Sequence, residues 1–165
     1  MKIAILSDLH DNYADWQIIS KIIKKEKIAN LIYCGDLASP IMLAKMAEDF
    51  DGHINLVYGN VADREREKIV AEENKSKVTH YGQAGEFILD GKKIALTHFP
   101  DQAKKFVSAG RFDLVCYGHT HLKTFEKIKN TYLLNPGTAG GMFQYPSFAV
   151  FDLKNMKNEF REITL

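Results

Sequence analysis

The stretch Tyr117-Gly118-His119-Thr120-His121 organises the fold predicted for this chain. It follows a run of strand-like residues, Asp113 to Tyr117, and places two histidines two positions apart. Side chains of an extended chain alternate between its two faces, so both imidazoles can point to the same side. Because imidazole is the commonest metal-ligating side chain, this stretch predicts a metal site. The prediction depends on whether other strands end in further ligands.

Length and charge describe an ordinary globular chain. The 165 residues include 22 Lys and Arg against 21 Asp and Glu, a formal net charge of +1. A near-neutral chain has no bulk electrostatic attraction for nucleic acid or membrane. We expect one domain, residues 1–165, with its own hydrophobic core.

The N-terminal residues and the cysteines bear on the compartment. Met1 to Leu6 is too short for a transmembrane helix and lacks the features of a signal peptide. Cys34 and Cys116 are the two cysteines, interpreted as small buried residues at strand ends without a disulfide. The cytoplasm is therefore the expected compartment. The sequence leaves the oligomeric state open, a homo-oligomer included.

Strands and helices alternate in the first half of the chain. The expected strands are Lys2–Ser7, Asn30–Cys34 and His53–Tyr58. The first expected helix is capped by Asp11 or Asn12 and runs to about Lys27; the second starts at Ser39-Pro40 and buries Phe50. This alternation predicts a parallel sheet with crossover helices, in which ligands bind beyond the carboxyl ends of the strands.

The second half is expected to be mostly antiparallel strand. Asp63–Lys77 is interpreted as a charged, solvated helix whose arginines could instead reach a phosphate. The expected hairpins pair Glu86–Asp90 with Lys92–Thr97, Lys123–Lys129 with Tyr132–Leu134, and Ser147–Leu153 with Glu159–Leu165. A helix over Asp101–Ala109 ends at Gly110. Two packed sheets with helices outside are the expected result.

Candidate metal ligands follow five of the expected strands. They are two carboxylates, one amide and four imidazoles: Asp8, His10, Asp36, Asn60, His98, His119 and His121. Each alone is compatible with a turn residue or a structural histidine. Together at one edge of a sheet, they would be costly without cations. Their oxygen and nitrogen donors suit Mn, Fe, Ni, Zn or Co, and seven ligands suit two ions bridged by one carboxylate.

Two other histidines are assigned structural roles. His53 begins an expected strand, and His80 lies in a polar connection. The loop Asn135–Gly141 is rich in glycine, and its Gly137-Thr138 is a candidate for holding phosphate, as are the free N–H groups of Asn60–Ala62 before the next helix.

The order of the motifs points to a known family. The motifs are Asp8-Leu9-His10, Gly35-Asp36, Gly59-Asn60, Thr97-His98 and Gly118-His119-Thr120-His121, together with Ser7-Asp8, Cys34-Gly35 and Asn135-Pro136-Gly137-Thr138. From Lys2 to about Leu153 the chain resembles the calcineurin-like metallophosphoesterases, above all their small stand-alone phosphodiesterases from bacteria and archaea. The resemblance implies an α/β (α+β) fold, a four-layer αββα sandwich of two mixed β-sheets flanked by helices.

The resemblance also implies a dinuclear metal centre. Its first ion would be held by Asp8, His10, Asp36 and His121. Its second ion would be held by Asp36, Asn60, His98 and His119, with Asp36 as the bridge. Asp36, Asn60 and His119 are also the expected catalytic residues. Mn²⁺ or Ni²⁺ are the expected metals, and Fe, Zn, Co or Mg are alternatives.

Two departures from the family pattern affect the expected chemistry. The family often has a histidine after the asparagine ligand, which helps protonate the leaving group or bind phosphate. Here Val61-Ala62-Asp63 follows Asn60. Many relatives also have Gly-His after the ligand matching His98, where this chain has Phe99-Pro100. All seven ligands remain, but the route of leaving-group protonation differs.

The expected activity is metal-dependent hydrolysis of a small phosphodiester, by attack of a metal-bridging hydroxide on phosphorus. A phosphomonoesterase with the same site is one alternative. A non-catalytic scaffold of the same fold, as in a relative from the retromer coat, is another, and retention of every ligand disfavours it. No aromatic and basic run marks a nucleic-acid track.

Overall fold

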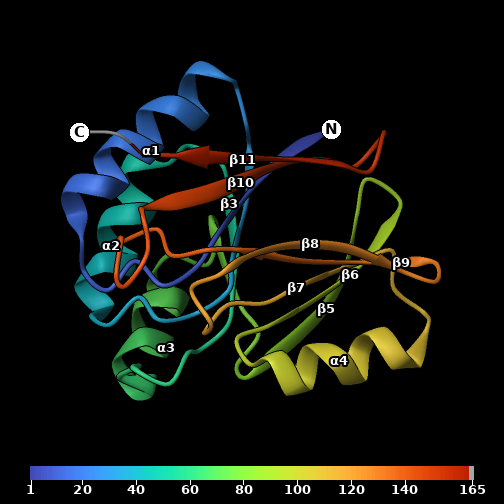
Figure 1. The fold of residues 1–165 in the computed structure, drawn as a ribbon. Coiled ribbons are helices and arrows are strands. Elements are labelled where there is room, and N and C mark those ends of the chain that lie inside the picture. Colours follow the sequence, from blue (N-terminus) through green and yellow to red (C-terminus); the bar gives the residue numbers. More distant parts are fainter. Residues whose placement is uncertain (164–165) are drawn as a thin grey trace.

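Two β-sheets lie face to face between outer layers of helices, as Figure 1 shows. The structure is a computed structural model that describes residues 1–163. The layers run from three helices through a six-stranded and a five-stranded sheet to a fourth helix. This arrangement confirms the expected αββα sandwich of two mixed sheets.

The six-stranded sheet has the order β11-β10-β1-β2-β3-β4. Its strands are β1 (Lys2–Leu6), β2 (Asn30–Tyr33), β3 (His53–Leu56), β4 (Val78–His80), β10 (Ser147–Asp152) and β11 (Lys157–Glu162). Strands β1 to β4 are parallel, whereas β10 is antiparallel to β1 and β11. The four parallel strands confirm the parallel sheet that the alternating strands and helices of the first half predicted.

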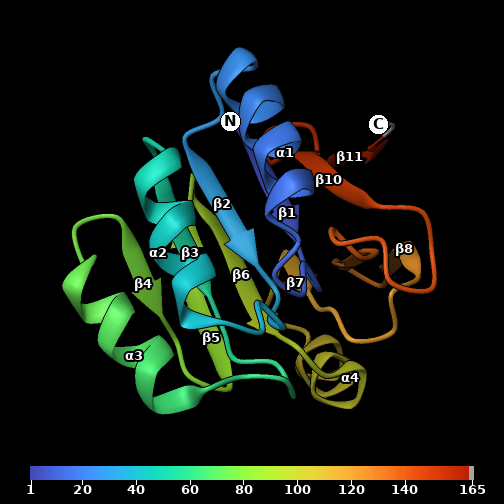
Figure 2. The same cartoon turned by 90° about the vertical axis from the view of Figure 1, so that its left-hand side faces the viewer.

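Three helices cover the outer face of this sheet (Figure 2). They are α1 (Tyr13–Lys25), α2 (Pro40–Asp49) and α3 (Arg64–Glu73). Each is capped by a polar side chain that accepts a backbone N–H: Asn12, Ser39 and Asp63. Such caps satisfy N–H groups that have no partner within the helix.

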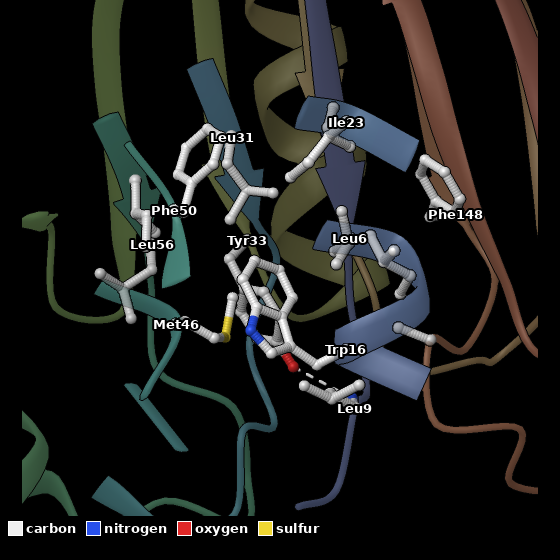
Figure 3. Close-up of a cluster of buried hydrophobic side chains, with 14 of the residues drawn as sticks. Leu6, Leu9, Trp16, Ile23, Leu31, Tyr33, Met46, Phe50, Leu56 and Phe148 are labelled. Atoms are coloured by element: carbon white, nitrogen blue, oxygen red, sulfur yellow. Dashed lines mark hydrogen bonds between the residues drawn. The ribbon is translucent and has the colours of Figure 1, made fainter. Parts of the chain in front are cut away.

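A buried cluster beneath α1 and α2 fixes two loops that carry candidate ligands (Figure 3). Tyr33 is fully buried in this cluster beside Trp16. Its hydroxyl accepts a hydrogen bond from Leu9 N at 3.0 Å and donates one to Asp36 O at 3.3 Å. One phenol therefore ties the loop after β1 to the loop after β2. Burial raises the pKa of Tyr33 well above its ordinary value, so the phenol keeps the proton that it donates.

The five-stranded sheet has the order β5-β6-β7-β9-β8. Its strands are β5 (Ala84–Leu89), β6 (Lys92–Thr97), β7 (Leu114–Cys116), β8 (Lys123–Ile128) and β9 (Thr131–Pro136). Helix α4 (Pro100–Ala109) packs on its outer face and ends at Gly110, whose φ is 66°. The expected hairpins are present, but β6, β7 and β9 run parallel. The second half is mostly antiparallel, as expected, with β7 as the exception, because it is parallel to both of its neighbours.

The core between the sheets consists of aliphatic and aromatic side chains from both inner faces. Cys34 and Cys116 are free, fully buried thiols in this layer. The interpretation as small core residues is thereby confirmed. Among the described residues, no helix is long and apolar enough to cross a membrane.

Several boundaries differ from the sequence-based expectation; α3, for example, spans Arg64–Glu73 where Asp63–Lys77 was expected. His80 lies in β4 and not in a polar connection, and β4 itself was not predicted, because three residues give no readable alternation. The glycine-rich loop starts later than expected, because Asn135 and Pro136 extend β9. The last strand was expected to reach Leu165; β11 ends at Glu162, and residues 164–165 lie outside the described part.

Candidate metal centre

All seven candidate ligands lie in loops at the carboxyl ends of parallel strands. Five of them have a left-handed backbone: Asp8 (φ 55°), His10 (47°), Asp36 (58°), His119 (70°) and His121 (59°). Such conformations are rare outside glycine and gather at functional sites, where the surroundings impose them. We had expected an extended chain here, with both imidazoles of the opening motif on the same side. The left-handed backbone at His119 and His121 shows that the chain is not extended at this point. The two imidazoles leave a left-handed turn after β7 in different directions.

Asp8 Oδ1 is the centre of the first group of ligands. It lies 3.2 Å from His121 Nε2 and 3.8 Å from His10 Nε2. Within residues 1–163, Asp8 Oδ1 and His10 Nε2 are buried atoms without any hydrogen-bond partner. A buried carboxylate and imidazole in this state are costly, and a shared cation would satisfy both.

Asn60 Oδ1 is the centre of the second group. It lies 2.9 Å from His98 Nε2 and 2.8 Å from His119 Nδ1. His98 Nε2 is also 3.3 Å from Asp36 Oδ2. Oxygen and nitrogen donors of this kind suit a divalent transition metal.

The two groups are adjacent. Ligand atoms of Asp8, Asp36 and His98 lie within 4.8 Å of one another. Burial alone would raise the pKa of Asp36, but hydrogen bonds from His98 and from Val61 N–H outweigh it and hold that pKa below its usual value. Burial lowers the pKa of His98, and the interaction with Asp36 outweighs this effect and raises it. The site thus favours an ionised Asp36, as a metal ligand requires.

Backbone carbonyls orient two of the imidazoles. His98 Nδ1 lies 2.8 Å from Cys34 O, and His121 Nδ1 lies 2.9 Å from Met142 O. A carbonyl can only accept, so each Nδ1 carries a proton, and Nε2 of each ring faces the centre. Such outer hydrogen bonds set the tautomer and direction of metal-binding histidines.

Two glycines allow the ligand loops to approach one another. A Cβ on Gly59 would lie 1.8 Å from Asp36 Oδ1, and one on Gly118 would lie 1.9 Å from Ser7 Oγ. No side chain fits at either position without displacing a ligand loop. The small residue before His119 is therefore required by packing.

The Gly137-Thr138 segment supports the centre from behind. Both residues are buried. The Thr138 hydroxyl donates to Asp8 O at 2.9 Å and accepts from Met142 N at 3.3 Å. It therefore joins the loop of Asp8 to the carbonyl that orients His121. The burial of the segment and these contacts favour the structural role for Gly137-Thr138, and the alternative that it holds phosphate stays a prediction. The N–H of Val61, also considered for phosphate, donates to Asp36 Oδ1 at 2.7 Å.

The centre opens into a pocket of about 340 Å³. Its lining combines candidate ligands with Val61, Thr120, Met142, Phe143 and Gln144. No Lys or Arg is among the described lining residues. Arg64 instead lies over the Tyr58 ring and Arg66 faces Asp63 at 3.7 Å, so the expected alternative of a phosphate-binding arginine has no support.

The comparison with known families agrees with this geometry. The model of the calcineurin-like phosphoesterase superfamily domain matches residues 1–156. The chain belongs to this superfamily. A phosphodiesterase of Methanocaldococcus jannaschii is 32% identical to this calcineurin-like chain over 171 residues, with 100% of the chain and 99% of the relative covered. The family is metal-dependent, and the chain has candidate metal-binding residues. Its membership of the family and its likeness to a phosphodiesterase assign it to the hydrolases of the phosphoesterase class.

Solved structures place this calcineurin-like chain in the same fold. An archaeal phosphodiesterase superposes with a TM-score of 0.92 at 26% identity, covering 99% of this chain and 100% of the other. Vps29 of Entamoeba histolytica, a single mutant, superposes with a TM-score of 0.70 at 16% identity, with 99% and 100% covered. The second likeness concerns the fold alone.

Sequence reasoning missed the supporting role of three residues at the calcineurin-like centre, although Thr138 had been singled out as a candidate for holding phosphate. They are Tyr33, Thr138 and Met142, which act through a phenol, a hydroxyl and a backbone carbonyl. A tyrosine in a buried strand next to Cys34-Gly35-Asp36 was a usable signal, because a buried phenol needs a partner. The carbonyl of Met142 carried no signal, since any residue supplies one.

Proposed function

We propose that the chain hydrolyses small phosphodiesters at a centre of two divalent metal ions. In this proposal Asp8, His10, Asp36 and His121 hold the first ion. Asp36, Asn60, His98 and His119 hold the second, so Asp36 is shared. Mn²⁺ or Ni²⁺ are the proposed metals.

One observation carries the proposal: Asp8 Oδ1 and His10 Nε2 are buried, 3.8 Å apart, and without a hydrogen-bond partner among the described residues. Side chains packed for stability alone pair such atoms. Here the pair is too far apart to bond directly, yet near enough to share one ion at ligand distances of about 2.0–2.2 Å.

The side chains of this chain position the reaction. When bound, two divalent ions lower the pKa of a water and offset the charge of the phosphoryl oxygens. Asp36 is fixed by Val61 N–H and faces His98, so its carboxylate is held ready between the two groups of ligands. Asn60 and His119 are exposed to the pocket, where they face an entering ester.

The pocket favours diesters with good leaving groups. Its described lining residues include no Lys or Arg to offset the second negative charge of a monoester. Val61 stands where the family often has histidine, and the described lining residues that are not ligands offer no acid for the leaving oxygen. A diester, with one negative charge and an activated leaving group, is the best-matched substrate.

The decisive experiment compares metals and esters on metal-stripped protein. The protein is reloaded with Mn, Ni, Zn or Mg and assayed on bis(4-nitrophenyl) phosphate and 4-nitrophenyl phosphate. The expected result is turnover of the diester with at least one metal and slower turnover of the monoester. Faster monoester hydrolysis would assign a phosphomonoesterase. Absence of turnover with every metal, and of bound metal by elemental analysis, would overturn the enzyme proposal.

A further inference from the structure

Two aromatic side chains stand exposed beside the metal centre. Phe143 is 86% exposed and Tyr145 is 82% exposed, both in the connection between β9 and β10. Apolar rings of this size normally bury their faces, so two neighbouring exposed rings mark a binding surface. Neither ring contributes to the buried clusters of the described residues.

The backbone holds Phe143 in a strained conformation. Its φ is 65°, which is an outlier for a bulky residue. The ring lies 5.7 Å from that of His121, centroid to centroid, with the two planes inclined by 30°. The strain therefore places an exposed aromatic face directly beside a candidate ligand of the first ion, and such strain gathers at functional sites.

The pocket continues along this aromatic loop. His121 and Gln144 line both the metal pocket and an adjoining hollow of about 260 Å³. Tyr145 and Leu122 also line that hollow. A molecule whose phosphorus lies at the metals can therefore extend past Phe143 toward Tyr145.

The charges around the adjoining hollow favour a neutral group on the ligand. Lys123 is the single Lys or Arg among the described lining residues of the hollow, and its ammonium is paired with Glu162. No free cation among the described lining residues is available to a second phosphate. The Gln144 amide offers both a donor and an acceptor to the edge of a polar ring.

We propose that this aromatic loop is a subsite for a planar, uncharged ring carried by the diester, such as a heteroaromatic base linked through its sugar. Phe143 and Tyr145 would stack on the ring faces, and Gln144 would bond its edge. Ring stacking of this kind tolerates many bases, because each presents a π-face, whereas a short alkyl group has no such face to stack. The inference rests on the proposed diester hydrolysis, because the metals would hold the phosphate.

The test measures binding to metal-loaded protein by titration calorimetry, so that it does not depend on turnover. Thymidine 5′-ethyl phosphate carries a planar ring, whereas diethyl phosphate carries none, and both have poor leaving groups. Wild-type protein is expected to bind the thymidine ester at least about tenfold more tightly, as one stacked base implies. The ratio should fall about tenfold in Phe143→Ala, by less in Phe143→Leu, and stay unchanged in Tyr145→Phe.

Ile88→Ala is the matched control, because Ile88 is 68% exposed and lines a separate hollow on β5. It should leave the ratio of the two affinities unchanged. Equal affinity of wild-type protein for both diesters would overturn the subsite. The subsite would also be overturned if substitution of Phe143 and Tyr145 changed self-association of the protein but left the ratio of the two diester affinities unchanged. Parallel assays on bis(4-nitrophenyl) phosphate keep the two questions separate, because turnover without ring preference would refute only the subsite.

Discussion

Asp8 and His119 are joined by a hydrogen bond across 111 positions of the chain, from His119 N to Asp8 Oδ2 at 3.1 Å. The other oxygen of the same carboxylate lies 3.2 Å from His121 Nε2. One side chain therefore anchors the turn of the histidine motif and also supplies a candidate ligand atom. Without metal, the same carboxylate is fully buried near that of Asp36.

This double role predicts opposite effects of Asp8→Asn with and without metal. An asparagine oxygen still accepts the His119 N–H, and removal of the charge relieves repulsion from Asp36. Metal-free Asp8→Asn should therefore melt about 2–4 °C above metal-free wild type, equivalent to about 1 kcal/mol. Saturating Mn²⁺ should stabilise wild type by about 2–4 kcal/mol and the variant by far less. Calorimetric scans of both proteins, with chelator and with metal, measure these shifts.

Asp8→Ala is the control for the anchoring bond, since it removes charge and acceptor together. It should melt below Asp8→Asn in chelator, because the His119 N–H loses its partner. A metal-free Asp8→Asn less stable than wild type, with metal stabilisation intact, would contradict the assignment of Asp8 as a ligand.

The second prediction separates the two histidines of the motif. His121 faces Asp8 and His119 faces Asn60, so each single alanine variant should keep about one of two bound ions. Adding His10→Ala should cost no further ion in the His121 variant, because both residues belong to the same group. In the His119 variant, adding His10→Ala should remove the remaining ion. Metal content after gel filtration, by elemental analysis, distinguishes these patterns. Loss of both ions in either single variant would argue against two separable groups.

The gathering of the candidate ligands was predictable from sequence because each candidate follows a strand whose end is readable. Apolar runs ending at Asp8, Asp36 and Asn60 imply strands, and parallel strands bring their carboxyl ends together. What sequence could not show was direction. The left-handed turns at His119 and His121 override the alternation that we assumed, and the hydroxyl of Thr138 bonds across the fold to the loop of Asp8. Such links depend on tertiary contacts and not on local pattern.

The contacts of His80, away from the candidate metal centre, likewise could not be predicted from local sequence. They give the third prediction. Gly82 N donates to its Nδ1 at 2.9 Å, so the ring proton lies on Nε2, which donates to Glu67 Oε1 at 2.9 Å. The Glu67 and His80 side chains are 2% and 6% exposed. His80→Leu would leave a buried carboxylate without its partner and should cost about 3 kcal/mol in urea unfolding.

Glu67→Gln is the matched variant, because its amide oxygen still accepts from His80. Its free energy of unfolding should stay within about 1 kcal/mol of wild type. The double variant Glu67→Leu, His80→Leu should recover part of the loss of His80→Leu, since no buried charge remains. Equal destabilisation by Glu67→Gln and His80→Leu would indicate that the charge, and not the hydrogen bond, holds β4 to α3.

The fourth prediction concerns Val61, the residue that stands in place of the family's histidine. Val61 is 46% exposed and lines the metal pocket. Without an acid there, the departing oxygen leaves with most of its negative charge. In a series of aryl methyl phosphates, kcat/KM of wild type should therefore fall steeply as the pKa of the leaving phenol rises. Val61→His should flatten that dependence and raise kcat/KM for the poorest leaving group by about 100-fold, the usual size of general-acid catalysis.

The gain should also depend on pH. A histidine with a pKa near its ordinary value of about 6.5 donates a proton only below that pH, so the advantage of Val61→His should fade as pH rises through it. Val61→Asn separates proton donation from polarity, because an amide does not titrate, and it should keep the steep dependence of wild type. Parallel slopes for Val61→His and wild type would mean that the leaving oxygen receives its proton elsewhere, from a residue of the centre or from solvent. The candidate ligands His10 and His119, which also line the pocket, would then be the next positions to vary.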